Sequence, residues 1–438
     1  MPRLSQRGEA RLEEVNIPVR HFIPGKYYDP KHDPDGVINM ATAENSLMVP
    51  ELLEHIHTHF HLEPIHLKYQ ATLLASSYLS VGDALRIYIN DTFHPRQLIL
   101  PEEIVPGPGL GALFAQFIWH TCDEGDGVVL TTPYYDATYP RETSYHARAK
   151  LVPARIPRDI DPLSLAAIPY ISDTIETANA NGIRARVLIL CNPHNPLARA
   201  YPVETILAYT SLAQKYDLHL LVDEIYGNEV FSSSKVPTPP PFISILTMDV
   251  ESLTGCDPSR IHVLAGPTKD FGASGLKVGA FVSQANPDIV KVLRASLGPI
   301  PTSSASDSIM SAVLYDTEFR DWFLVENRRR LATAFEQTAS WCDFHEIPYE
   351  PASAGVYVLM DLGPILDRQS GKGTPDDIKV DNAVSAMLAN GVYLRPTIGA
   401  HDQIPTRFRM TFTLAPDTML IALKRLEKAF ALRDGWSN

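Results

Sequence analysis

The sequence predicts an α/β fold with a mostly parallel sheet, followed by a second and smaller α+β lobe. Short apolar runs alternate with helix-like segments, and these runs are VVLTT at 128, RVLILC at 186, LHLLVD at 218, IHVLAG at 261 and GAFVS at 279. Because parallel strands need helical crossovers, this alternation is typical of a sheet with helices on both faces. After about residue 303 the pattern changes to a long helical stretch at 318–342, strands at 356–362 and 407–413, and a closing helix at 417–433. This change predicts the second lobe.

Length and composition are those of an ordinary globular protein of enzyme size. The chain has 438 residues, 45% of them hydrophobic and 20% charged, so an ordered core is expected. A net charge of −13 leaves no basic surface for nucleic acid or for an anionic membrane. The four cysteines form no C-x-x-C pair, and the sequence predicts neither a signal peptide nor a membrane span. We therefore expect a cytoplasmic protein whose partner is a small molecule, with no nucleic acid and no membrane.

The candidate functional residues follow the predicted strands at their carboxyl ends, where ligands of open parallel sheets bind. Asp223 and Tyr226 follow the run at 218, Asn195 lies in the NPHNP segment after the run at 186, and Lys269 follows the run at 261. Each also fits a purely structural role on its own. Asp223 could cap a helix, the NPHNP segment could be a plain turn, and Lys269 could be a solvated surface group.

A glycine-rich turn at 107–111 precedes an apolar helix and includes Gly109 and Leu110. A helix that begins there offers backbone N–H groups and the positive end of its dipole to an anion. The same residues match a loose G-x-G-x-x-A pattern, which raises a dinucleotide-binding dehydrogenase as an alternative. The next strand ends in two threonines and lacks the acid that would bind a ribose hydroxyl, which disfavours that alternative.

The glycine-rich turn, PYY, NPHNP, DEIY, K-D-x-G and a late R-F-R occur in this order along the chain. Together they resemble the fold-type I pyridoxal-phosphate enzymes of the aspartate aminotransferase superfamily. Within it, the entry segment with Ala43-Glu44-Asn45 is similar to the 1-aminocyclopropane-1-carboxylate (ACC) synthase-like branch, which includes fungal carbon-sulfur lyases of gliotoxin-type toxin biosynthesis. The resemblance implies an aspartate aminotransferase-like fold in a homodimer. The large domain, residues 66–305, would hold a mostly parallel seven-stranded sheet, and residues 1–65 and 306–438 would form the small domain.

The resemblance also assigns roles around pyridoxal 5'-phosphate. Lys269 would form the Schiff base with the cofactor and later serve as the base that removes the substrate α-proton. Asp223 would pair with the pyridine nitrogen, and Asn195 and Tyr226 would bind the phenolic oxygen. Tyr134 would stack on the ring.

Four further residues take roles at the edges of that site. Gly109 and Leu110 would offer backbone N–H groups to the cofactor phosphate, and Tyr78 would reach the phosphate of the neighbouring subunit. Arg409 would hold the substrate carboxylate as a two-pronged fork.

Two positions depart from the family pattern, and both concern the cofactor phosphate. Gly266 stands where a serine is usual, and Lys277 stands where an arginine is usual. A lysine keeps the charge but loses the bidentate geometry of arginine. We therefore expect weaker retention of the cofactor than is usual in the family.

Glu44 bears on the reaction, because an acid at this position is typical of the ACC synthase-like branch. An acid here would suit a substrate with a cationic sulfonium, such as S-adenosylmethionine, or would serve proton transfer in another elimination. If the role of Glu44 is only structural, it is a first-turn acid near a helix N-terminus. The resemblance thus favours a carbon-sulfur lyase acting on a small amino-acid substrate. That enzyme would cleave a cysteine thioether conjugate by β-elimination, or convert S-adenosylmethionine to ACC by γ-elimination. Transamination is the main alternative, and a non-catalytic regulator is a third.

Overall fold

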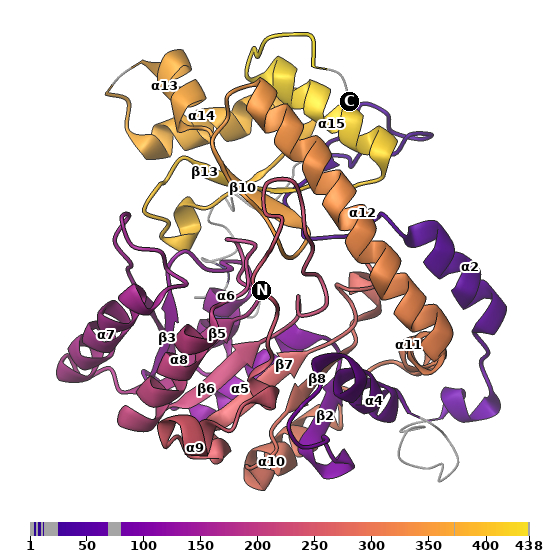
Figure 1. Cartoon of the computed structure of the whole chain (residues 1–438), viewed down its shortest axis with the longest axis vertical. Helices are drawn as coiled ribbons and strands as arrows, with labels where there is room; N and C mark the ends of the chain where they lie inside the picture. Colours follow the sequence, from indigo (N-terminus) through magenta and orange to yellow (C-terminus); the bar gives the residue numbers. More distant parts are fainter. Residues whose placement is uncertain are drawn as a thin grey trace.

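The computed structural model describes residues 4–5, 8–9, 12, 25–68, 80–371 and 373–436. A large sheet with its helices forms one lobe, and a smaller sheet with α13, α14 and α15 forms the other (Figure 1). The long helix α12 runs from one lobe toward the other (Figure 1). The α/β class with a second α+β lobe is confirmed.

The large sheet has seven strands in the order β2-β8-β7-β6-β5-β3-β4. Their bounds are β2 (Ile104–Gly107), β3 (Gly127–Thr131), β4 (Lys150–Ala154), β5 (Ala185–Cys191), β6 (His219–Asp223), β7 (Ile261–Ala265) and β8 (Gly279–Val282). Strands β3 to β7 pair in parallel, whereas β8 is antiparallel to both β7 and β2. The predicted seven-stranded, mostly parallel sheet is therefore confirmed.

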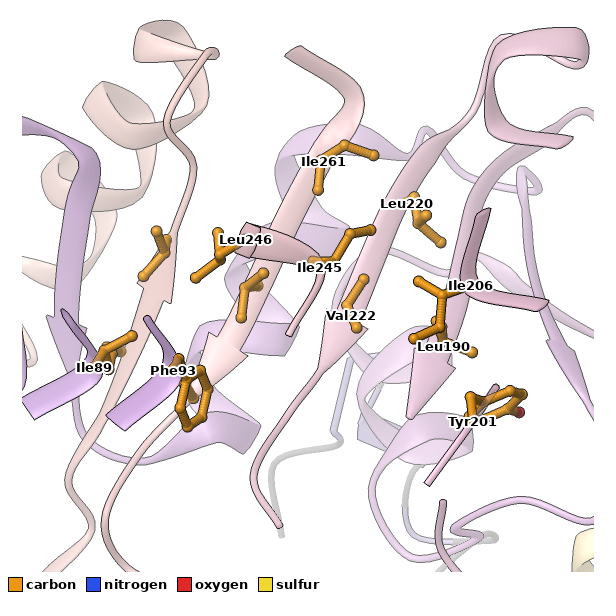
Figure 2. Close-up of a cluster of buried hydrophobic side chains, with 14 of the residues drawn as sticks. Ile89, Phe93, Leu190, Tyr201, Ile206, Leu220, Val222, Ile245, Leu246 and Ile261 are labelled. Carbon is orange, nitrogen blue, oxygen red and sulfur yellow. The ribbon is translucent and has the colours of Figure 1, made fainter. Parts of the chain in front are cut away.

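Helices cover both faces of this sheet. The helices of this lobe are α4 (Val81–Phe93), α5 (Leu110–Thr121), α6 (Tyr139–Tyr145), α7 (Ile168–Ala180), α8 (Val203–Lys215), α9 (Val250–Thr254), α10 (Pro287–Leu297) and α11 (Ser304–Tyr315), and α2 (Val49–His59) packs against α11. In β6, Leu220 and Val222 pack into the hydrophobic cluster that contains Ile206 of α8 (Figure 2). Leu221, which lies between them, packs into a different hydrophobic cluster, formed with residues of α5 and α10. Successive side chains of a strand point to opposite faces, so a strand buried on both faces reads as a continuous apolar run.

The second lobe is built on the antiparallel sheet β12-β13-β10-β9. Its elements are α12 (Thr317–Phe344), β9 (Tyr349–Glu350), β10 (Tyr357–Asp361), α13 (Gly363–Ser370), α14 (Asp376–Ala389), β11 (Val392–Tyr393), β12 (Arg395–Pro396), β13 (Arg407–Thr411) and α15 (Pro416–Ala429). Asp316 caps α12 by accepting a hydrogen bond from the Phe319 N–H at 3.0 Å. The N-terminal strand β1 (Ile38–Asn39) pairs in parallel with β11. We therefore propose that the N-terminal segment as far as β1 belongs to this lobe, in line with the resemblance, whereas α2, which the resemblance also implied for the small domain, packs against α11 and places Leu52 in the core cluster of the large lobe.

Across the described ranges, the model contains no helix that combines the length and the apolar character needed to cross a membrane. All four cysteines are buried and unpaired.

Candidate active site

The ends of three neighbouring parallel strands form the floor of the site. Cys191 at the end of β5 is paired with Asp223 at the end of β6, which is paired in turn with Leu264 of β7. Above these ends lies a cavity of about 510 Å³. The predicted site residues on its wall are Gly109, Leu110, Asn195, Asp223, Tyr226, Lys269 and Lys277. The structure thus brings together residues as far apart in the sequence as Gly109 and Lys277.

Lys269 reaches into the cavity from the segment after β7. Its Nζ donates hydrogen bonds to the Ala43 carbonyl oxygen and to Ser274 Oγ, the latter at 3.2 Å. Burial disfavours the charged ammonium and lowers the pKa of Lys269 to about 8, although the negative charge of Glu229 acts in the opposite direction. A larger fraction of this lysine is therefore uncharged near neutral pH than of an ordinary surface lysine, and an uncharged amine can act as a nucleophile and a base.

Asp223 is held in place by two hydrogen bonds. Its Oδ2 accepts from the Tyr139 hydroxyl at 2.7 Å, and its Oδ1 accepts from the Ile225 N–H at 3.2 Å. Burial raises the pKa of Asp223, while the Tyr139 hydrogen bond opposes this shift. Sequence reasoning missed Tyr139, whose only local signal is its place at the start of a helix in the segment after β3.

Arg409 is fixed beside the cavity by Asn195 and by the N-terminal segment. Its Nη1 donates to Asn195 Oδ1 at 2.9 Å, and its Nη2 donates to the Ala41 carbonyl oxygen at 2.6 Å. The guanidinium carbon lies 5.0 Å from the centre of the Tyr357 ring and 5.6 Å from that of Tyr135. Arg409 Nε is buried and has no hydrogen-bond partner among the described residues. An N–H donor is therefore available for a substrate carboxylate.

The glycine-rich turn lies directly against Lys277. Gly109 has φ +87°, a backbone conformation that favours glycine, and a Cβ on it would lie in ordinary contact with Lys277 Cδ, at 3.6 Å. Helix α5 begins at Leu110, and the first residues of this helix and Lys277 all line the cavity. These groups could hold the phosphate of a cofactor.

The packing around Gly266 leaves little room for a serine there. A Cβ on Gly266 would lie 3.3 Å from Leu110 Cδ1, 3.2 Å from the Val278 carbonyl oxygen and 3.1 Å from the Gly279 Cα. A serine side chain here would therefore be tightly packed, and Leu110 or the neighbouring backbone would have to shift by a few tenths of an ångström.

The two tyrosines of the PYY motif occupy different places. Tyr135 lines the main cavity, whereas the Tyr134 hydroxyl shares a hydrogen bond of 3.0 Å with His401 Nδ1. Tyr134 instead lines a small neighbouring cavity together with Arg409. This position does not fit the stacking role expected of Tyr134, because adjacent side chains in an extended segment point to different sides. We propose Tyr135 for that role.

Two other predicted residues lie at or beyond the edge of the site. Glu44 is exposed, adjoins Ala43 of the cavity wall, and its charge favours the ammonium form of Lys269. Tyr78 lies outside the described residues. The prediction of its role stays untested.

The histidine run at 55–61 takes part in helix packing. His55, His59 and Asp316 bring possible ligand atoms within 4.8 Å of one another. The His55 ring, however, stacks on Phe319 at 3.8 Å and on His59 at 4.2 Å, and the His59 Nδ1 bonds the His55 carbonyl oxygen. The rings are thus engaged in packing, and we assign no metal to them.

Comparison with known proteins agrees with this geometry. Residues 74–426 match the family model described as aminotransferase class I and II. The chain belongs to this family. It is similar to the probable aminotransferase gliI of Aspergillus fumigatus, with 29% identity covering 90% of this chain and 89% of the relative. It is also similar to the probable aminotransferase sirI of Leptosphaeria maculans, with 28% identity covering 97% of this chain and 98% of the relative.

A plant relative and solved structures extend the comparison. The 1-aminocyclopropane-1-carboxylate synthase 2 of Cucurbita pepo is 28% identical, covering 97% of this chain and 86% of the relative. The aspartate aminotransferase from Thermus thermophilus with maleate aligns with a TM-score of 0.69 at 16% identity, covering 98% of this chain and all of that one. This last likeness confirms the aspartate aminotransferase-like fold.

As a member of the class I and II aminotransferase family, the protein is a pyridoxal-phosphate-dependent enzyme, and its cavity fits that cofactor. Lys269 would offer an amine of lowered pKa to the aldehyde, and Asp223 on the cavity wall would offer a carboxylate to the pyridine nitrogen. The α5 N-terminus and Lys277 offer positive charge to the phosphate. A buried carboxylate without a cation beside it is costly, so a protonated ring nitrogen would stabilise Asp223.

We expect Lys277→Arg to retain the cofactor more tightly than the parent, because guanidinium binds phosphate with two hydrogen bonds. One added charged hydrogen bond should slow cofactor release about tenfold, measured from the loss of cofactor absorbance during dilution or dialysis. Gly266→Ser is the matched comparison. It should not slow release, because its side chain would press on Leu110. Equal release from Lys277→Arg and the parent would contradict the prediction.

Proposed function

We propose that the protein is a pyridoxal-phosphate-dependent carbon-sulfur lyase acting on an α-amino acid with a sulfur leaving group. The observation that carries the proposal is the Glu44 carboxylate, which sits at the cavity edge and acts electrostatically on Lys269. An acid beside the catalytic base suits a cationic sulfonium, and it can also deliver a proton to a departing sulfur. The ACC synthase among the relatives supports the same direction. The enzyme is proposed to work as a homodimer, as the family resemblance implies, and in the cytoplasm, as the cysteine pattern and the lack of a predicted signal peptide suggest.

The residues on the wall divide the work of such a reaction. Bound cofactor would supply a ring that accepts the electrons left at the substrate α-carbon. Arg409 would bind the substrate α-carboxylate through its free Nε–H and hold the α-carbon near Lys269. The Lys269 amine would take the α-proton, while Asp223, fixed by Tyr139, would keep the ring nitrogen charged. The sulfur group then departs from the β-carbon or the γ-carbon.

Transamination is the second candidate, and the names of the fungal relatives favour it. Both gliI and sirI are called probable aminotransferases. The same Lys269, Asp223 and Arg409 would serve, since the two reactions share the removal of the α-proton and differ in what happens afterwards. The carboxylate of Glu44 has no evident task in that reaction.

The test is mass spectrometry of products after incubating the cofactor-loaded enzyme with S-adenosylmethionine and, separately, with a cysteine thioether conjugate. ACC and methylthioadenosine from the first substrate, or a free thiol from the second, would support the lyase. Glu44→Gln should reduce either product while leaving the amount of bound cofactor unchanged. A keto acid formed only when an amino-group acceptor is supplied would replace the proposal with transamination.

A further inference from the structure

Asp136 and Arg395 form an ion pair between the two lobes, beside the active site. Asp136 follows Tyr135 in the segment between β3 and α6, whereas Arg395 lies on β12 of the second lobe. Arg395 Nε donates to Asp136 Oδ1 at 2.7 Å, and Arg395 Nη2 lies 2.6 Å from the same oxygen. The side chains of Arg395 and Asp136 are only 11% and 7% exposed, so solvent screens their attraction little.

Arg409, the residue proposed to bind the substrate carboxylate, is a close neighbour of this pair. Arg395 and Arg409 lie opposite each other in the antiparallel strands β12 and β13, which directs both side chains to one face of the sheet. The guanidinium carbons lie 6.0 Å (Arg395) and 5.6 Å (Arg409) from the centre of the Tyr135 ring. Asp136, Arg395 and Arg409 also line one small cavity of about 10 Å³, so the three charged groups meet at one place.

Two arginines and one carboxylate thus share this place, and the structure pairs them in one particular way. Asp136 is bound to Arg395. Arg409, by contrast, donates to two uncharged groups, Asn195 Oδ1 and the Ala41 carbonyl oxygen. The opposite pairing would block binding, because a carboxylate bound to Arg409 would occupy the guanidinium that a substrate carboxylate needs. Asp136 is therefore a competitor for Arg409, and Arg395 is the group that holds it.

We propose that Arg395 is a positioning residue that holds the Asp136 carboxylate away from Arg409 and so keeps Arg409 available to the carboxylate of the substrate. Asp136 in turn offsets the charge of Arg395, which would otherwise repel Arg409 across the two strands. Among the described residues on this cavity wall, Arg409 is left as the cation without a carboxylate partner, which suits a substrate that presents one carboxylate here. The inference rests on the role proposed for Arg409, and it holds for carbon-sulfur cleavage and transamination alike.

The test compares how two ligands bind to the holoenzyme, read from the change in cofactor absorbance. 2-Aminoisobutyrate carries an α-carboxylate but no α-proton, so proton removal cannot turn it over, and isopropylamine is the same molecule without the carboxylate. The ratio of the two Kd values gives the preference for the carboxylate alone. Arg395→Gln should reduce this preference at least about tenfold, because Asp136, no longer held by Arg395, competes for Arg409. Arg395→Lys keeps the charge but loses the arginine geometry, and should reduce it about threefold.

A double variant separates this role from simple packing. Asp136→Asn combined with Arg395→Gln removes the competing carboxylate as well as its partner. The preference should then return to within about threefold of the parent, although the contact between the lobes is lost. A double variant with as little preference as Arg395→Gln would overturn the proposal, as would an undiminished preference in Arg395→Gln. If Arg395→Gln does not fold, a parent-like preference in Arg395→Lys decides against the proposal in the same way.

Glu350→Gln is the matched control. It breaks an arginine–carboxylate pair of 2.8 Å with Arg407 that lies within the small sheet and does not join the lobes, so its preference should equal that of the parent. An equal loss in Glu350→Gln and Arg395→Gln would overturn the proposal. An undiminished preference in Arg409→Gln would overturn both the role of Arg409 and this inference. The choice between lyase and transaminase is tested by the products, which this binding ratio does not involve.

Discussion

Replacing Lys269 by alanine should reduce turnover more than about 10⁴-fold, whichever bond the enzyme cleaves, because one side chain provides both covalent attachment and acid–base catalysis. The structure gives the reasons. Lys269 lies in the cavity, burial lowers its pKa to about 8, and its nitrogen is oriented by Ala43 and Ser274. Turnover should be measured as product released per enzyme under saturating substrate and cofactor.

The control for this variant is Lys291→Ala, which removes an exposed lysine on α10. It should keep parent-like turnover and folding. Borohydride reduction should attach the cofactor covalently to the parent and to the control, at Lys269, and should fail to attach it in Lys269→Ala. Undiminished turnover in Lys269→Ala would refute the assignment of the whole site.

The strand ends explain why so much of the site could be read from the sequence. Asp223, Asn195 and Lys269 each follow an apolar run, and parallel strands bring their carboxyl ends to one edge of a sheet. Knowing the order of these short motifs was therefore enough to predict that Asp223, Asn195 and Lys269 share the cavity. The same argument predicted the mostly parallel sheet, because its strands are apolar on both faces.

What the sequence could not supply are the contacts between side chains of distant elements. The choice between Tyr134 and Tyr135 depends on which of two adjacent side chains faces the cavity, and a single motif does not encode that. The bond between Tyr139 and Asp223 joins residues 84 positions apart.

Arg409→Gln should lower kcat/KM by about 30-fold or more, since truncating one partner of a buried charge pair costs about 2–5 kcal/mol. Arg409 is 2% exposed, and its Nη atoms donate to Asn195 and Ala41, which leaves its Nε–H without a partner among the described residues. Glutamine has no guanidinium and therefore cannot make the two Nη contacts and offer the Nε–H at the same time. Most of the loss should appear in KM, because the arginine binds the carboxylate both before and during the reaction. The cofactor absorbance should be retained.

Arg407→Gln provides the comparison on the same strand. Arg407 lies two residues earlier on β13, and its Nη2 bonds Glu350 Oε1 at 2.8 Å, away from the main cavity. Losing this ion pair should lower stability slightly and leave kcat/KM close to that of the parent. If both variants lost kcat/KM equally, the effect would be one of strand packing, and the substrate carboxylate would have to be held elsewhere. A loss confined to Arg409→Gln would instead show that β13 places one arginine for binding and the other for structure.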